Sequence, residues 1–304
     1  MKKLTNFEKY SFYDIRKGGN KENTIDEKNI KKLNEIAKVD LLFIGSILDV
    51  ICNWQYSFHN KYNIHKSIIS KWYFRLYDLF HPLIIFGAGF RIPSQKYYKE
   101  SYVRKIKIIA VRGNITLQRL KKNGLRISHP VILADPGILF PLSIKFKKVK
   151  TIDRIYQLCI IPHYLDKGNN LIKQKILVNQ SLTLNINDNP YKFMKSLSKC
   201  KRVLSSSLHG LIASDSLGIP NMRMIVSVSP SISTYKFKDY YSAYGLNSIP
   251  TIDLRKSFFT KNKLKLIDLN YKISINMIKT KQCQLLINFP FQLNKEFKKL
   301  KIYI

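Results

Sequence analysis

The feature that most constrains the fold is an alternation of short apolar runs with longer segments of helical periodicity. In the first half of the chain four such runs are typical of buried strands, and each ends on glycine or a polar loop: VDLLFIGS (39–46), PLIIFGAG (82–89), IKIIAVRG (106–113) and HPVILADPG (129–137). Strands covered by helices on both faces of a parallel sheet read as nearly continuous apolar runs. Their carboxyl ends border a ligand crevice. The alternation therefore predicts an α/β architecture.

Helices are expected between these strands, and a second α/β unit begins with YQLCIIPHY (156–164). Glycine ends a helix readily, so Gly124 and Gly218 are expected stops. The predicted helices are 72–80, NITLQRLKKNG (114–124), NPYKFMKSLSKC (189–200) and LHGLIASDSLG (208–218). The further predicted strands are KQKILVNQS (173–181), KRVLSSS (201–207) and NMRMIVS (221–227). The tail from Asn262 to Ile304 is predicted to be largely helical, with an interruption at Pro290.

The length favours two domains. A chain of 304 residues is long for one core and sufficient for two domains of about 150 residues each. The basic, polar stretch from Leu142 to Asp153 is the expected linker. We therefore expect an N-terminal unit over 1–147 and a C-terminal unit with a helical tail over 148–304.

The charge balance is strongly basic, with 53 Lys and Arg against 19 Asp and Glu, a formal net charge of +34. Such an excess suits nucleic acid, an anionic membrane or phosphorylated substrates, or it reflects solvated lysines in a chain rich in Lys, Asn and Ile. Only KNKLK (261–265) and KEFKKLK (295–301) form local basic patches. No helix-turn-helix, zinc-finger or RNA-binding pattern is present, so nucleic acid is not the expected partner.

The four cysteines (52, 159, 200 and 283) lie far apart and lack metal-type spacing, so neither a zinc site nor a disulfide framework is indicated. A reducing compartment fits this pattern. No apolar signal core follows the first lysines, and the apolar runs fall short of the roughly 20 residues of a spanning helix. The expected location is cytoplasmic.

The segment VLSSSLHGLIASDSLGIP (203–220) combines strand, turn and helix signals. It places Ser206 or Ser207 at a helix N-cap and His209 in the first turn, where backbone N–H groups and the helix dipole attract anions. Gly210 would allow a ligand to approach the backbone. There His209 could contact a phosphate or transfer a proton. The plain alternative is a serine-capped helix with a packed histidine.

The segment AVRGNITLQRL (110–120) has the same organisation, with Arg112 at a strand end and Gly113 before a helix. An arginine there can bind a carboxylate or phosphate through two hydrogen bonds. An interdomain ion pair is the alternative. Gly87 and Gly89 are expected to keep the floor of the cleft open, and a lone GxG does not indicate a dinucleotide.

Several motifs then occur in one order: VRG (111–113), ADPGILFP (134–141), CIIPHY (159–164), SSSLHGLIASDSLGIPN (205–221), KFKDYY (236–241) and YGL (244–246). This order resembles the polysaccharide pyruvyl transferase family, from about Phe86 to Leu246. The resemblance implies two Rossmann-like domains facing across a cleft, as in GT-B glycosyltransferases. It implies transfer of the enolpyruvyl group of phosphoenolpyruvate onto a sugar, which forms a pyruvate ketal and releases phosphate. Neither a metal nor another cofactor is expected.

The resemblance implies roles for Arg112 and His209, which match positions that hold the donor or act on it, and the chemistry suggests further candidates. His209 and His163 are the acid/base candidates, and Asp135 would orient the acceptor or an arginine unless it only forms an Asp-Pro turn. The substrate-binding candidates are Arg112, Gly113, Ser206, Ser207, Leu208, Gly210, Lys236, Lys238, Asp135, Gly87 and Gly89. Many family members have arginine directly before Leu-His-Gly, where this chain has Ser207. Lys236 or Lys238 is therefore expected to supply the missing cation.

The expected partners are phosphoenolpyruvate, a glycan or lipid-linked oligosaccharide acceptor of a capsule or exopolysaccharide, and the anionic inner face of the membrane at its periphery. Three alternatives stay open. A GT-B-type glycosyltransferase would use a nucleotide sugar, an inactive family member would only bind glycan, and a nucleic-acid-binding protein would use the charge and the tyrosines.

Overall fold

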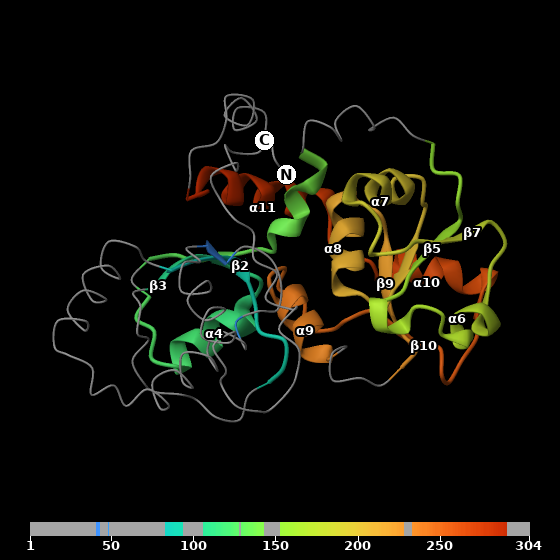
Figure 1. Ribbon diagram of the computed structural model, residues 1–304, viewed down its shortest axis with the longest axis horizontal. Helices are drawn as coiled ribbons and strands as arrows, with labels where there is room; N and C mark the ends of the chain where they lie inside the picture. The colour runs from blue at the N-terminus through green and yellow to red at the C-terminus, as the bar shows by residue number, and fades with distance from the viewer. Residues whose placement is uncertain are drawn as a thin grey trace, which may run out of the picture.

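The computed structural model describes residues 41–42, 48, 83–93, 106–127, 129–142, 153–227 and 233–290 of the chain. Two parallel sheets organise these residues (Figure 1). The expected helix at 72–80, the expected linker after Leu142, the basic patch at 295–301 and most of the run 39–46 lie outside the described residues.

The first sheet is four-stranded, in the order β1-β2-β3-β4, and every neighbouring pair is parallel. Its strands are β1 (Leu41–Leu42), β2 (Leu83–Ala88), β3 (Ile106–Val111) and β4 (Ile132–Leu133). The predictions for β2 and β3 are confirmed. Strand β4 is shorter than expected, because the chain turns at Asp135 into a 3-10 segment that begins at Pro136, which cannot donate to a ladder.

The second sheet is five-stranded and parallel, in the order β10-β9-β8-β5-β7. Its strands are β5 (Leu158–Ile161), β7 (Ser181–Thr183), β8 (Val203–Ser205), β9 (Asn221–Ile225) and β10 (Thr251–Asp253). A two-stranded parallel pair joins β6 (Ile176–Leu177) to β11 (Phe259–Thr260). Because β5 and β8 are neighbours, their carboxyl ends lie side by side, with Ile161 opposite Ser205.

The helices follow the predicted periodicity in most places. They are α4 (Asn114–Lys122), α6 (Asn170–Lys175), α7 (Pro190–Leu197), α8 (Leu208–Ser216), α9 (Thr234–Ser242), α10 (Leu264–Asn270) and α11 (Ile275–Ile287), with short 3-10 turns η3 (Pro136–Leu142), η4 (Tyr164–Asp166) and η6 (Lys261–Lys263). Gly124 and Gly218 take positive φ angles of 86° and 62° after α4 and α8, which confirms both as helix stops.

The strand predicted over 173–181 is wrong in its first part. Lys173 to Lys175 belong to α6, which starts at an N-cap where the Asn169 side chain accepts from the Leu171 backbone N–H at 3.0 Å. A capped helix satisfies N–H groups that a strand edge would leave open, so the cap decides the local structure. Helix α9 was not predicted as a helix at all.

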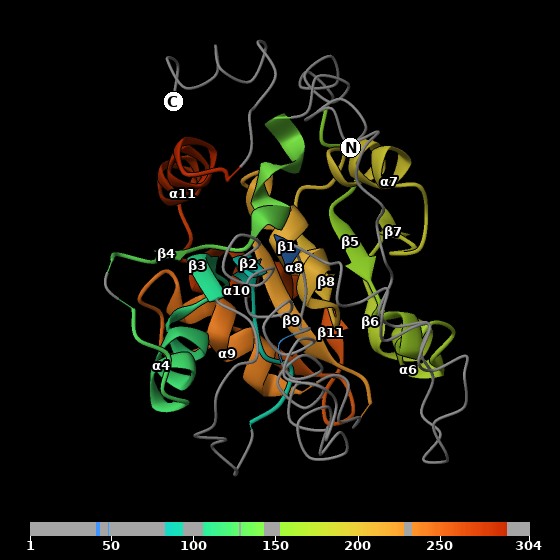
Figure 2. The same ribbon diagram turned by 60° about the vertical axis from the view of Figure 1, so that its left-hand side comes forward.

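One buried apolar cluster joins the first sheet to the helices α8, α9 and α11. Phe86 and Ala110 of the first sheet pack in it with Leu211 of α8, Tyr240 of α9 and Leu285 of α11. In both views α9 lies between α4 and the second sheet (Figures 1 and 2). The α/β class with parallel sheets is confirmed. Two GT-B-like domains with a boundary near 147 stay a prediction.

The cysteine prediction is wrong for one pair. Cys159 on β5 and Cys200 form a disulfide, with their Cα atoms 5.7 Å apart. They are 41 residues apart in sequence, but β5 pairs with β8, and Tyr156 bridges to Cys200, so the sheet brings them together. Spacing along the chain therefore did not reveal the bond, and it no longer supports a reducing compartment.

Among the residues that the structure describes, none of the helices combines the length and the apolar character needed to cross a membrane.

Candidate functional site

The site candidates gather where parallel strands end. Arg112 follows β3, His163 follows β5 by one proline, and Ser206 follows β8. The backbone N–H of His163 donates to Ser206 Oγ at 2.9 Å. The structure thus joins the CIIPHY and SSSLHG motifs directly, as expected for adjacent strand ends.

The serines after β8 are buried and bind protein groups. Ser206 Oγ donates to Asp166 Oδ2 at 2.6 Å, and Ser227 Oγ donates to the other carboxylate oxygen. Ser205 Oγ accepts from the Ser207 N–H at 3.0 Å. These bonds hold the turn after β5 against the turn after β8. The Ser206 hydroxyl and the Ser207 backbone therefore bond to protein groups, and a substrate contact by either serine stays a prediction.

The first turn of α8 presents His209 outward. Ser207 is the N-cap but its side chain makes no capping hydrogen bond, Leu208 is buried, and His209 is exposed. Gly210 corrects an expectation, because a Cβ there would lie 2.4 Å from Ser205 Oγ and 2.9 Å from an Ile161 methyl group. Its missing side chain admits the neighbouring strands, not a ligand.

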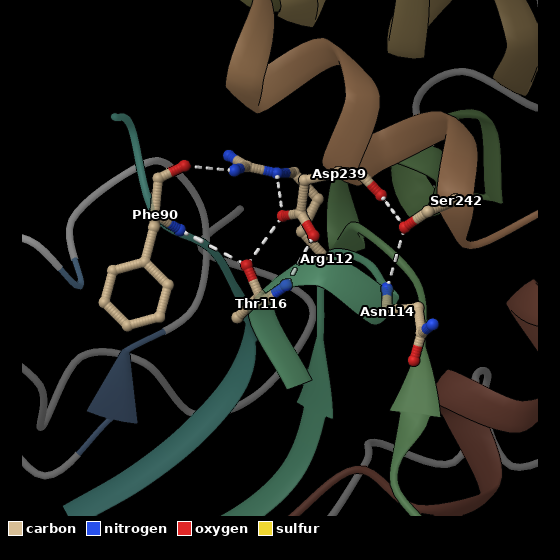
Figure 3. A network of polar contacts seen from close by, with 6 residues as sticks. All are labelled: Phe90, Arg112, Asn114, Thr116, Asp239 and Ser242. Atoms are coloured by element: carbon tan, nitrogen blue, oxygen red, sulfur yellow. Dashed lines mark hydrogen bonds and ion pairs between the residues drawn. The ribbon is translucent and has the colours of Figure 1, made fainter. Parts of the chain in front are cut away.

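Arg112 lies in a buried ion pair, the alternative that the sequence left open. Its side chain is 1% exposed, and its Nε lies 2.9 Å from Asp239 Oδ2 on α9 (Figure 3). Asp239 also accepts from the Thr116 N–H at 2.8 Å and from Thr116 Oγ1 at 2.7 Å. A second guanidinium nitrogen donates to the Phe90 carbonyl. The guanidinium thus ties β2 and β3 to α9, and a donor contact by Arg112 stays a prediction.

The glycines around Arg112 make room for this pair. A Cβ at Gly89 would lie 2.5 Å from the guanidinium carbon, and one at Gly113 would lie 1.7 Å from the Asp239 carbonyl oxygen. Gly87 has φ of +83° and faces Pro136. The expectation that Gly87 and Gly89 hold a cleft open is therefore replaced by close packing of protein on protein.

Lys236 and Lys238, two residues apart on α9, differ in burial. Lys236 is buried and Lys238 is exposed. The pKa of Lys236 is lowered to about 8, first by burial and then by the charges of Arg112, Arg223 and Arg91, while the charge of Asp166 opposes the shift. Arg91, Arg112, Arg223 and Lys236 are called the cation cluster below.

Arg223 comes from within β9 and is also buried. Its guanidinium lies 4.3 Å from the centre of the Phe237 ring and donates to Thr234 Oγ1 at 3.0 Å. Lys236 Nζ lies 5.6 Å from the same ring. Phe237 therefore supports two members of the cation cluster.

His163 borders the cation cluster. Burial, and then the charge of Lys236, lower its pKa to about 4, while Asp166 opposes the shift. The imidazole is therefore neutral near pH 7, and its Nδ1 accepts from the Leu165 N–H at 3.4 Å.

Asp135 forms the turn that was its plain alternative. Its Oδ1 accepts from the Gly137 N–H at 2.9 Å, and its buried Oδ2 has no hydrogen-bond partner. Burial raises its pKa to about 6, and the charge of Arg112 opposes this shift. A role of Asp135 in orienting the acceptor or an arginine stays a prediction.

Sequence reasoning missed Asp166, Asp239, Arg223 and Ser227. Two signals were available: Asp239 is the one acid of KFKDYY, and Arg223 interrupts the apolar strand NMRMIVS. A charge inside a buried strand needs a partner, so it points to a site. No group of three or more His, Cys, Asp and Glu side chains that could hold a metal ion occurs within the described ranges.

Comparisons with known proteins place the chain. The family model for polysaccharide pyruvyl transferase matches residues 2–227. The chain is 33% identical over 195 residues to uncharacterized protein L143 of Acanthamoeba polyphaga mimivirus, an alignment that covers 61% of this chain and 62% of that protein. The chain thus spans less than two thirds of that relative's length. No solved structure matches it. The motif order and the family model agree, and the chain belongs to the polysaccharide pyruvyl transferase family, a family of transferase enzymes.

Proposed function

We propose that this protein transfers the enolpyruvyl group of phosphoenolpyruvate onto a sugar of a surface polysaccharide, or of its lipid-linked precursor, and leaves a pyruvate ketal. Family membership supports pyruvyl transfer to polysaccharide in general. The donor, the ketal and the residue roles are our inference.

The cation cluster is the observation that carries the proposal. Phosphoenolpyruvate combines a carboxylate with a phosphate, so its site needs several fixed cations that are partly shielded from water. Arg91, Arg112 and Arg223 each lower the pKa of Lys236, and Asp166 opposes them. Because Arg112 is already paired with Asp239, Lys236 and Arg223 are the buried cations that we propose for the donor. Lys236 then supplies the charge that the arginine before Leu-His-Gly supplies in many relatives.

The reaction balances without a redox step. A proton adds to the methylene carbon of phosphoenolpyruvate, and a sugar hydroxyl adds to the neighbouring carbon and loses its own proton. The C–O bond to phosphate breaks as a second hydroxyl forms the second C–O bond, and the proton of this second hydroxyl leaves on the phosphate. Phosphate leaves and the two sugar oxygens share one ketal carbon. The chemistry needs one proton donor, one proton acceptor and cations for the departing phosphate.

His163 is our second acid/base candidate, because its backbone N–H bond to Ser206 holds it at the end of β5 beside β8. His209 is our candidate for the proton donor or the phosphate contact, at the exposed first turn of α8. No additional cofactor enters this scheme.

The proposal also includes where in the cell the protein acts. We place the reaction in the cytoplasm, with the basic surface in peripheral contact with the anionic inner face of the membrane, where a lipid-linked acceptor would be reached. Binding to anionic vesicles at low salt that is lost at high salt is the expected result, and indifference to such vesicles would remove the membrane contact from the proposal.

Calorimetric titration with phosphoenolpyruvate, beside UDP and GDP sugars, tests the donor. We expect phosphoenolpyruvate alone to bind, and Lys236→Ala to weaken it by tenfold or more. The exposed Lys238→Ala on the same helix provides the comparison and should change the affinity less than twofold. Binding of a nucleotide sugar without binding of phosphoenolpyruvate would favour a glycosyltransferase instead.

A further inference from the structure

The turn after β5 displays an aromatic ring next to His163. Tyr164 opens η4 and is 53% exposed. Its ring centre lies 4.5 Å from that of His163, with 38° between the planes. The Tyr164 ring thus leaves a large apolar surface open to solvent directly beside His163.

Hydrogen bonds to buried residues hold this turn in place. Asp166, which ends η4, is buried and accepts hydrogen bonds from Ser206 and Ser227, on the turn after β8 and after β9. The Asp166 N–H donates to the His163 carbonyl at 2.7 Å, and the Leu165 N–H donates to His163 Nδ1 at 3.4 Å. The exposed ring therefore stands on an anchored turn whose orientation is set by the same serines that position the site.

We propose that Tyr164 is the platform on which the acceptor sugar stacks. A pyranose carries C–H groups on one face and hydroxyls around its rim, so an exposed aromatic ring can cover the apolar face while hydroxyls reach polar groups at the edge. The stacked sugar then lies beside the imidazole of His163, the second acid/base candidate. The inference rests on the proposed function and adds the residue that holds the acceptor.

Leu165 offers a matched control, since it is the next residue of the same turn and is 50% exposed. An aliphatic side chain lacks the flat face that stacking requires. Loss of a general apolar surface would affect both positions, whereas loss of a stacking platform affects Tyr164 alone.

The test measures sugar binding separately from donor binding. Saturation-transfer NMR with methyl pyranosides of glucose, galactose, mannose and N-acetylglucosamine needs no donor. We expect at least one glycoside to bind the wild type, Tyr164→Ala to weaken it at least tenfold, and Tyr164→Phe and Leu165→Ala to stay within twofold. Calorimetry should show phosphoenolpyruvate binding to Tyr164→Ala within twofold of wild type.

Three outcomes would overturn the platform: no glycoside binds the wild type, Tyr164→Ala binds as the wild type does, or Leu165→Ala loses as much affinity as Tyr164→Ala. Failure of phosphoenolpyruvate to bind the wild type would instead count against the proposed function, because the NMR result on the sugar decides Tyr164 by itself.

Discussion

At the scale of single residues, the buried charges are satisfied by defined partners. Asp239 is fully buried and receives hydrogen bonds from Arg112 and from both the N–H and the hydroxyl of Thr116. Burying two charges is costly, and several hydrogen bonds are needed to offset that cost. The pair therefore specifies how α9 sits on α4 more than it adds net stability.

Asp239→Asn should lower the free energy of unfolding by about 3–5 kcal/mol, because it leaves the Arg112 charge buried without a counter-charge. Asp268→Asn is the control. It removes a partly exposed ion pair with Arg202, with N···O of 2.7 Å, and should cost about 0–1 kcal/mol. Urea denaturation followed by circular dichroism measures both, and equal losses would contradict the stated role of burial.

Lys236 should make donor affinity depend on pH. Its pKa is lowered to about 8, so the ammonium is charged below that pH and neutral above it. Phosphoenolpyruvate affinity should fall as pH rises through about 8, and Lys236→Ala should abolish this alkaline limb while keeping a weaker, flat affinity. Calorimetry from pH 7 to 9.5 measures this pH dependence. If the affinity of the variant falls with pH as that of the wild type does, another group than Lys236 titrates.

At the scale of elements, the disulfide joins β5 to the connection between α7 and β8. Both sulfur atoms belong to fully buried residues packed with Phe193 and Leu197 of α7. The strand that carries His163 at its end is thereby linked to the segment that leads to His209. The two halves of the candidate site share one covalent connection.

Breaking this bond should destabilise the fold. Closure of a loop between cysteines 41 residues apart stabilises by about 4 kcal/mol in the chain-entropy description, and measured values are commonly about 2–4 kcal/mol. Cys159→Ala combined with Cys200→Ala should lose that amount and become insensitive to reductant. Cys283→Ala, at the free cysteine of the described residues, should keep the wild-type response to reductant in denaturation curves. A wild type indifferent to reductant would contradict the prediction.

At the scale of the whole molecule, a polar group is buried beside the apolar cluster that joins the first sheet to α8, α9 and α11. Asp215 of α8 accepts from Tyr240 of α9 at 2.8 Å and from Asn221 of β9 at 2.6 Å. Burial raises its pKa from 3.8 to about 7, and the hydrogen bonds from its partners oppose the shift. The protonated form is therefore the one that folding favours.

Stability should consequently depend on pH through this residue. The folded-state pKa of Asp215 is the higher one, so its contribution is fully present below about pH 4 and is lost as pH rises through about 7. Asp135 acts in the same direction up to about pH 6. The lowered pKa of His163 acts oppositely, since its contribution is lost as pH falls from 6.5 towards 4.

Asp215→Asn isolates the effect, because the amide keeps hydrogen bonding with no titration. Between pH 5 and 7 the wild type should lose stability relative to this variant, by at most about 1.4 kcal/mol per pH unit for one proton. Urea denaturation at half-unit pH steps measures the difference. Parallel curves for the two proteins would show that Asp215 does not titrate in this range.

Much of this protein was determined by local sequence. Apolar runs such as PLIIFGAG and IKIIAVRG predicted β2 and β3, amphipathic spacing predicted α4, α7 and α8, and Gly124 and Gly218 predicted where helices stop. These features depend on residues within one or two turns of each other, so periodicity and backbone preference suffice. The order of motifs along the chain likewise identified the family.

The tertiary structure decided which distant residues meet. Arg112 and Asp239 are 127 residues apart, Cys159 and Cys200 are joined through strand pairing, and Gly89, Gly113 and Gly210 make room for protein rather than ligand. Choosing Lys236 over Lys238 required knowing which face of α9 is buried. These contacts depend on how the helices and strands pack together, and the local sequence pattern does not specify which distant residue each buried group will contact.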